Sequence, residues 1–314
     1  MIDFQYRYSS PRLINLIAEI ERGAGNWDRI GQNESIASKD LLLNTQEETL
    51  KAIISFETSN IPRERTLKEL IKEPAPESLS AAYFNSVHKR VFETENRHRQ
   101  RNVQFSLTDA SGINRALFPA TAPYVASNRF NELFPWFEEE LKIGTYHPLV
   151  VLGCFHVALL QTLPFAQGTH TCALLFMDKV LEKLNYSFVR YEHPFTRFAQ
   201  TRSKYIIALQ QAERSAFDNW STTSMWLEYF LQTMSEGLQV LLRNFEASTN
   251  ELKLTAVQQK IMSTIKDHGP STRELVARET GINLSTVKYN LGVLWRRGHL
   301  KRMGGGRTTS YILS

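Results

Sequence analysis

The sequence predicts a mostly α-helical protein: a helical body with one short β-hairpin, followed by a small module of helices and strands. Three observations favour this fold class. Apolar residues recur at helical spacing through most of the first 245 residues, two alternating stretches flank a turn at residues 109–112, and basic residues concentrate after residue 250. The 314 residues suffice for two or three domains, and the composition, 42% hydrophobic and 22% charged, is typical of globular proteins.

Residues 1–95 are predicted to be an N-terminal helical region. A helix starting near Arg12 places Leu13, Leu16, Ile17 and Ile20 on one face, and we expect it to end at the glycines 23 and 25. Further amphipathic helices are predicted for residues 38–56, 66–71 and 77–95, with prolines at 74 and 76 interrupting the chain before the last of them.

Residues 96–247 are predicted to form the core domain. Its hairpin pairs residues 102–107 with 116–118 across the turn Asp109-Ala110-Ser111-Gly112. Residues 147–160 are apolar on every side, which indicates a central helix surrounded by others. The polar residues 246–251 are expected to be a linker to a C-terminal domain, residues 248–314.

Charge separates the C-terminal region from the rest. Residues 251–314 carry eleven Lys and Arg against four acidic residues, a net charge of +7, whereas the preceding residues carry −2. This asymmetry indicates a polyanion-binding module. Two cysteines are too few for a disulfide scaffold, and residues 148–160 are too short to span a bilayer, so we expect a cytoplasmic protein with no membrane association.

Three helices are predicted in the C-terminal module. The first ends at Gly269-Pro270, and Ser271 with Glu274 forms a capping box for the second, which closes at Gly281. Ser285 is expected to cap the third helix, whose inward face carries Val287, Leu291 and Leu294. A turn of three glycines, residues 304–306, then separates two basic strands.

This order of elements resembles a winged helix-turn-helix, which places its last helix in the major groove of double-stranded DNA. The resemblance implies base contacts from Ser285, Thr286 and Tyr289, with Lys288 and Arg296 on the same helix and Arg302 and Arg307 on the wing meeting phosphates. The alternative is a winged helix that serves homodimerisation or contacts a protein partner.

The core sequence resembles the Fic family. Members have an H-P-L helix, a His seven residues before the signature, and the signature H-P-F-x-[DE]-G-N-G-R-x-x-R. This chain has His147-Pro148-Leu149-Val150, then His156, then Leu163-Pro164-Phe165-Ala166-Gln167-Gly168-Thr169-His170. The hairpin is similar to the flap with which the family binds its targets. The resemblance covers most of the chain and implies the Fic fold and transfer of AMP from ATP to a protein hydroxyl.

The signature lacks the residues that this chemistry requires. Leu163 replaces the general base, and the neutral Gln167 replaces the acidic Mg²⁺ ligand. Thr169 and His170 replace the Asn and second Gly of the phosphate nest, and Thr171 and Leu174 replace the two arginines; Gly168 remains. We therefore expect a pseudoenzyme without cofactor or metal.

Structural roles without catalysis account for most of these side chains. Thr169 and Thr171 are expected to cap the following helix, and His156 to be a hydrogen-bonded core histidine. His170 as a displaced base is the less favoured alternative. His193-Pro194-Phe195 repeats the letters of the signature, but no glycine follows, so the repeat is attributed to chance.

Many Fic proteins restrain themselves with a helix bearing [ST]-x-x-x-E-[GN], whose Glu pairs with a signature arginine. The nearest candidate, Glu57, lacks the flanking residues. With Thr171 and Leu174 at the arginine positions, a restraining Glu would have no arginine to pair with. Taken together, the sequence predicts a catalytically degenerate Fic-fold protein that regulates transcription through DNA. The alternatives are an AMP- or nucleotidyl-transferase with a non-standard site, and a protein-binding member of a toxin–antitoxin or defence pair.

Overall fold

A computed structural model describes residues 10–31, 36–57, 63–93, 98–118, 122–212, 223–252, 254–305 and 309–314. The chain divides into two compact units, residues 1–243 and 244–314. The first unit contains, in order, α1 (Pro11–Gly31), α2 (Ile36–Ser55), α3 (Glu64–Lys72), α4 (Ala81–Phe92), β1 (Phe105–Thr108), β2 (Asn114–Phe118), α5 (Pro123–Ile143), α6 (Pro148–Thr162), α7 (Thr169–Lys183), the 3-10 helix η1 (Ser187–Arg190), α8 (Pro194–Gln200), α9 (Arg202–Ala212) and most of α10 (Thr223–Leu252).

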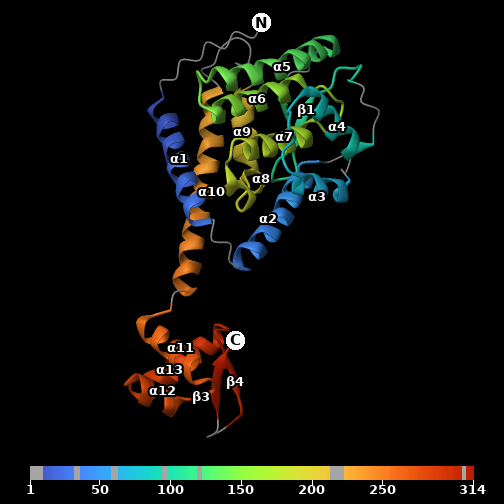
Figure 1. The fold of residues 1–314 in the computed structure, drawn as a ribbon. Coiled ribbons are helices and arrows are strands. Elements are labelled where there is room, and N and C mark those ends of the chain that lie inside the picture. The colour runs from blue at the N-terminus through green and yellow to red at the C-terminus, as the bar shows by residue number, and fades with distance from the viewer. Residues whose placement is uncertain are drawn as a thin grey trace. The chain divides into compact units, whose positions relative to one another are not determined.

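Helix α6 is the central helix of the first unit. Every residue from 149 to 162 is buried, as expected for a helix that is apolar on all sides. It packs against α5 and α7, and Figure 1 shows it lying beneath α5, which runs along the upper edge of the unit. Because α7 is also buried from residue 169 to 181, the loop that joins the two helices is fixed at both ends by the core.

Two helices run further than the sequence predicts. Helix α1 continues through Gly23 and Gly25. The neighbouring helix α10 lies so close that a Cβ at Gly23 would be 2.5 Å from Cδ2 of Leu238. The glycine therefore permits close helix packing and does not end the helix. Helix α10 continues through residues 246–251, so the expected linker is wrong; no proline or glycine there stops a helix that is already formed.

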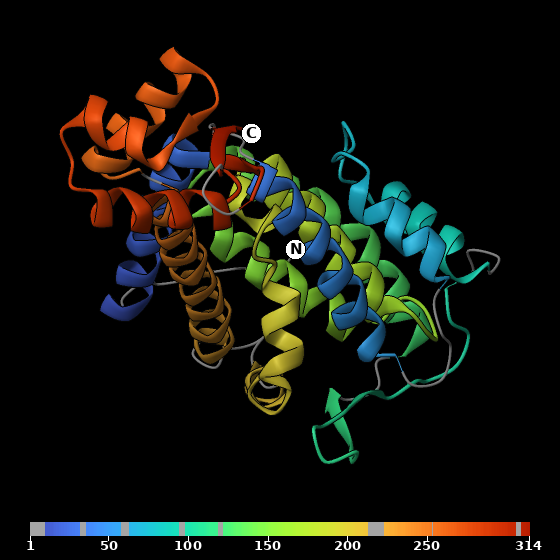
Figure 2. The same ribbon diagram turned by 90° about the horizontal axis from the view of Figure 1, so that it is seen from below.

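The predicted hairpin is present. Strand β1 pairs antiparallel with β2, and the hairpin projects from the helical body (Figure 2). The Asp109 carboxylate accepts hydrogen bonds from the backbone N–H groups of Ser111 and Ile113, at 2.9 and 3.0 Å, and pairs with Arg115 at 2.8 Å. The bond from Arg115 and the turn hydrogen bonds hold the pKa of Asp109 well below its usual range.

The second unit combines α11 (Ala256–His268), α12 (Arg273–Thr280) and α13 (Leu284–Arg296) with a three-stranded antiparallel sheet. Its strands are β3 (Ser271–Thr272), β4 (Leu300–Met303) and β5 (Ser310–Leu313), in the order β3-β5-β4. Its core contains the predicted inward residues of α13, Val287, Leu291 and Leu294, together with Ile261, Ile265, Val276 and Leu300. None of the described helices of either unit is long and apolar enough to cross a bilayer.

Two predicted caps lie one or two residues away from their true positions. Thr272, and not Ser271, caps α12 by accepting from the N–H of Leu275, while the Ser271 hydroxyl donates to the carbonyl of Gly269. Asn283, and not Ser285, caps α13 by accepting from the N–H of Thr286. Both segments offer adjacent Ser, Thr or Asn residues, and each of these is a good cap, so spacing alone did not choose between them.

Candidate functional site

The loop between α6 and α7 has a fixed, strained start. Leu163 ends α6 in the left-handed region, with φ 45° and ψ 63°, and its side chain is buried. The guanidinium Nε of Arg99 donates to the carbonyl of Leu163 at 2.7 Å, and the backbone N–H of Arg99 donates to the carbonyl of Pro164 at 3.0 Å. A buried arginine from before the hairpin thus holds the loop in place.

The middle of the loop is held by α4. His88 donates to the carbonyl of Gln167 at 3.0 Å, and its ring stacks on Phe165 with centroids 3.6 Å apart. Gly168 has φ +77°, and a Cβ there would lie 2.2 Å from the ring of Phe92. Only glycine satisfies both the backbone conformation and this close approach. The side chain of Gln167, by contrast, is exposed.

Helix α7 begins directly after this glycine. Gly168 is the N-cap and supplies no side-chain bond, so the expected capping by Thr169 and Thr171 is wrong. The Thr169 hydroxyl instead contacts the backbone N–H and carbonyl of Phe165, at 3.3 and 3.4 Å. A small cavity of 140 Å³ opens beside this helix end, between the loop, β1 and the residues that follow α2.

An acidic side chain lies at the first turn of α7. The Glu57 carboxylate accepts from the hydroxyl of Thr171 at 2.5 Å and from the backbone N–H of the same residue. The hydrogen-bond partner of Glu57 is thus a threonine and not an arginine. Burial raises the pKa of Glu57, and the two bonds from Thr171 oppose that rise. The carboxylate occupies a position where the unpaired N–H groups of a helix N-terminus attract an anion.

Two histidines and a tyrosine form a buried cluster behind the loop. The hydroxyl of Tyr205 is 2.7 Å from Nε2 of His170 and 3.5 Å from Nε2 of His156. Neither Nδ1 atom has a hydrogen-bond partner among the described residues, so the expectation of a fully hydrogen-bonded His156 is wrong. Burial lowers the pKa of His156 to about 3 and that of His170 well below its ordinary value, so both rings are neutral at pH 7.

No protein-family model matches the sequence, and no curated protein matches it. Solved structures do. A Fic family protein from Desulfovibrio desulfuricans G20 superposes with a TM-score of 0.60 at 17% sequence identity, over 99% of this chain and 98% of that chain. The chain has the Fic fold. A Fic-domain-containing signaling protein from Bacteroides thetaiotaomicron VPI-5482 covers 73% of this chain and 95% of its own length, with a TM-score of 0.48 and 14% identity.

The positions that resemble the Fic signature lie in three different environments. Leu163 and His170 line the small cavity with their buried side chains, and Gln167 lies at its exposed side. Thr171 faces Glu57, whereas Leu174 is fully buried in the core of the Fic-fold body. The cavity wall therefore presents apolar atoms at Leu163, and neither Thr171 nor Leu174 offers a cation.

The described C-terminal residues that we predict to contact DNA lie largely on one exposed face. Ser285, Lys288, Tyr289 and Arg296 are exposed on α13, and 68% of the Tyr289 surface is accessible; Thr286 is half-buried. Arg296 donates to the carbonyl of Gly292 at 3.2 Å. Arg302 is exposed on β4, and its guanidinium is 3.4 Å from the hydroxyl of Thr309. Arg307 lies outside the described residues.

Four residues that shape the signature site were not found as such by sequence reasoning: Arg99, His88, Tyr205 and Glu57. Each contacts the loop or α7 from a distant part of the chain; Glu57 and Thr171, for example, are 114 positions apart. No local spacing signals such a contact. The sequence contains a hint only for Glu57, which is compared with the restraint motif of the Fic family and rejected because the flanking residues differ.

The buried Glu57 makes the stability of the Fic-fold body depend on pH. Because its pKa in the folded protein is raised by burial, ionisation disfavours the folded state, and stability falls as pH rises through that pKa. We expect Glu57→Gln, which keeps an acceptor for Thr171, to be at least as stable as the parent at pH 7. The difference should shrink below the ordinary pKa of glutamate.

Urea unfolding at both pH values measures this difference, with the exposed Glu138→Gln as the matched control. A Glu57→Gln variant that is clearly less stable than the parent at pH 7 would show that the negative charge of the carboxylate stabilises the first turn of α7.

Proposed function

We propose that this protein binds double-stranded DNA and regulates transcription, and that its second unit is a winged helix. The observation that carries the proposal is the exposed face of α13. The opposite face of the helix, with Val287, Leu291 and Leu294, is fully buried. The helix is thereby held rigidly while Lys288 and Tyr289 project into solvent, which is the arrangement of a helix that enters a major groove.

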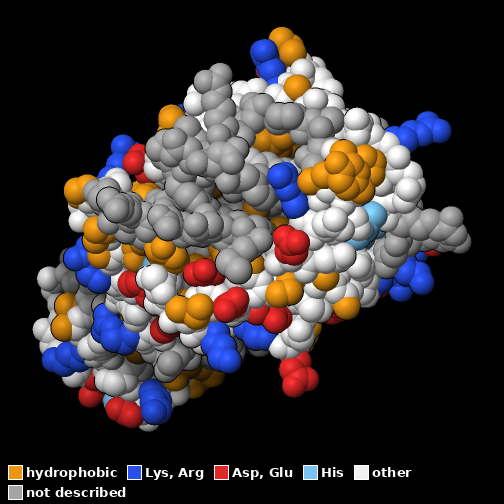
Figure 3. Space-filling model, turned by 90° about the horizontal axis from the view of Figure 1, so that it is seen from above, with side chains coloured by type: hydrophobic (Ala, Val, Ile, Leu, Met, Phe, Trp, Pro, Cys, Tyr) orange, Lys and Arg blue, Asp and Glu red, His pale blue; other side chains and the backbone are white. Residues whose placement is uncertain are grey.

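Charge supports the same proposal. The C-terminal residues carry a net charge of +7, and both α13 and β4 contribute exposed basic side chains. Arg302 lies on β4, next to the glycine turn. In a winged helix this strand would belong to the wing, which meets the phosphate backbone. On the face in Figure 3, the acidic and basic side chains of the described residues are interspersed, with no large area of either sign.

The Fic-fold body is proposed to be non-catalytic. AMP transfer needs a base with a lone pair, an acidic metal ligand and cations for the phosphates. The cavity offers Leu163 and Gln167 at the first two positions, and Glu57 already occupies the first turn of α7, where it would repel a phosphate. Among the alternatives, a nucleotidyl-transferase with a non-standard site gains no support from this geometry.

Selection of binding sites from a pool of random duplexes tests the assignment of base contacts. Tyr289→Ala should erode the preference for the selected sequence, because an exposed side chain near the start of α13 faces base edges. Arg302→Gln should weaken binding to all sequences about equally, because a phosphate contact carries no sequence information. Tyr289→Ala with an unchanged site preference would contradict the placement of α13 in the groove.

A further inference from the structure

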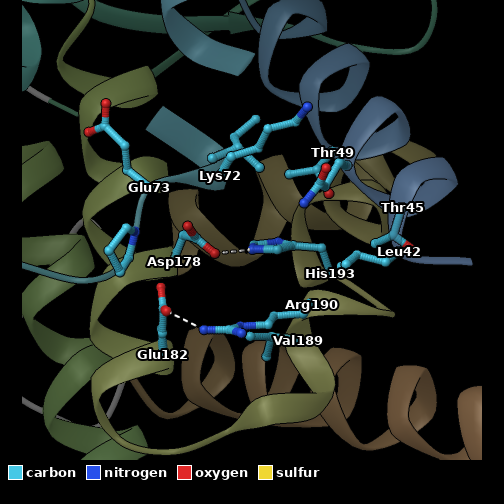
Figure 4. Close-up of a pocket in the computed structure, with 13 residues that line it drawn as sticks. Leu42, Thr45, Thr49, Lys72, Glu73, Asp178, Glu182, Val189, Arg190 and His193 are labelled. Atoms are coloured by element: carbon cyan, nitrogen blue, oxygen red, sulfur yellow. Dashed lines mark hydrogen bonds and ion pairs between the residues drawn. The ribbon is translucent and has the colours of Figure 1, made fainter. Parts of the chain in front are cut away.

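A second cavity in the described part of the Fic-fold body lies away from the signature loop. Its volume is 320 Å³, more than twice that of the cavity beside the signature, and it shares no lining residue with it. The side of α2 forms one wall, and α7 with the end of α3 forms the other (Figure 4). Its size falls at the lower end of the range of small-molecule pockets.

A buried lysine lies behind the α7 wall of this cavity. Lys179 is 1% exposed, and its ammonium group lies 2.9 Å from the carboxylate of its neighbour Asp178. It also donates to the carbonyl of Ile71, in the last turn of α3, and to that of Glu73, the residue that follows α3, at 3.3 and 2.7 Å. These two hydrogen bonds join the C-terminal end of α3 to α7 and hold the two elements of the wall together.

The inner surface of the cavity offers acceptors with spare capacity. The Asp178 carboxylate accepts a hydrogen bond from His193 at 2.8 Å, and the Glu182 carboxylate forms an ion pair with Arg190. In Figure 4 both carboxylates point toward these partners across the cavity. A carboxylate has about four acceptor sites, so each retains free ones. From the opposite wall, Oε1 of Gln46 is buried without a hydrogen-bond partner among the described residues. An unpaired buried acceptor is unfavourable and indicates that a donor belongs there.

The outer edge of the cavity is cationic. Lys72 and Arg190 both line it, and both are exposed to solvent. Burial alone would raise the pKa of Asp178, but the hydrogen bond from His193 and the charge of Lys179 outweigh it, so this carboxyl group is ionised. The cavity therefore presents negative charge and acceptors inside, and positive charge at its rim.

His193 does not make this cavity a catalytic site. Its Nε2–H donates to Asp178, and its Nδ1 accepts the backbone N–H of Phe195 at 3.4 Å as the N-cap of α8. Both ring nitrogens are occupied, so no lone pair is available for proton abstraction. The repeated letters His193-Pro194-Phe195 thus mark a helix cap, and the surrounding cavity is suited to binding without chemistry.

We propose that this cavity binds a small amino acid. The protonated amine has three hydrogens to donate, and the inner surface offers the two carboxylates of Asp178 and Glu182 and the amide oxygen of Gln46. The carboxylate of the amino acid faces the cations Arg190 and Lys72 at the rim. The binding site is independent of the DNA-binding role proposed above.

Binding of the common L-α-amino acids and β-alanine to the full-length protein, followed by thermal shift and then by calorimetry, tests the proposal. For the tightest binder, the amine and the carboxylic acid with the same carbon skeleton serve as probes of each charged group. We expect at least one amino acid to bind and its carboxylic acid analogue not to bind. The proposal fails if no amino acid binds, or if the carboxylic acid binds as tightly.

Two variants locate the site. Glu182→Gln removes a charge from the inner wall, and Gln46→Met removes the unpaired acceptor at nearly constant volume. Each should raise the Kd at least about tenfold. Glu47→Gln, on the neighbouring exposed position of α2 and outside the cavity lining, should leave the Kd unchanged. Thermal unfolding of the unliganded variants establishes that they are folded. Unchanged Kd values for both Glu182→Gln and Gln46→Met would overturn the assignment.

Discussion

Replacing Lys179 with methionine is expected to lower the free energy of unfolding by about 3–5 kcal/mol. The ammonium group is 1% exposed, and it neutralises Asp178 while it bonds two carbonyls at the C-terminal end of α3. Methionine fits the volume but leaves two carbonyls without this donor and the buried Asp178 carboxylate without its neighbouring cation. Removing one member of a buried charged network has this large effect because the remaining charge is left uncompensated.

Urea unfolding followed by circular dichroism measures the loss, with Lys183→Met as the control. Lys183 lies on the same helix and also donates to a carbonyl, that of Glu77, but it is exposed, so its removal should change stability by less than about 1 kcal/mol. If Lys179→Met were as stable as Lys183→Met, the buried lysine would not be the link between α3 and α7.

AMP transfer from ATP is expected to be absent, at least about 10⁴-fold below the rate of an enzyme with an intact signature. Leu163 cannot accept a proton, and Leu174 lies in the core, where it can hold no phosphate. Leu163→His alone should not restore transfer, because Glu57 and the missing arginines still oppose a triphosphate at α7.

Incubation with labelled ATP and Mg²⁺, with and without bystander proteins, measures the transfer. Incorporation by the folded wild-type protein that disappears on unfolding would contradict the pseudoenzyme interpretation. Incorporation by Leu163→His would show that the phosphate site had survived the changes at Thr171 and Leu174.

Periodicity predicted the elements whose pattern is governed by local burial. The all-apolar residues 147–160 became α6, and the turn at Asp109 joins a real hairpin. Glycines misled the prediction at α1, because the role of Gly23 depends on Leu238, more than two hundred residues away. The ends of α12 and α13 were misplaced because neighbouring polar residues compete as caps and only the folded backbone chooses among them.

The composition of the signature site could be predicted, but its contacts could not. The loss of polar groups at Leu163 and Leu174 follows from the residue types alone. The bond between Glu57 and Thr171 does not, because it joins the end of α2 to the start of α7 through the tertiary fold. The amino acid cavity is likewise assembled from α2, α3, α7 and the start of α8, none of which carries a local binding motif.

Salt dependence of DNA binding tests the central claim most directly. The affinity of the full-length protein for its selected duplex, measured by fluorescence anisotropy over a range of salt concentrations, is compared with that of a variant carrying Lys288→Gln, Arg296→Gln and Arg302→Gln together. We predict tight, strongly salt-dependent binding by the parent, and a variant whose log–log slope is shallower by up to about 0.9 for each phosphate contact removed. Equal affinity and equal slope for the two proteins would contradict DNA binding through the C-terminal unit.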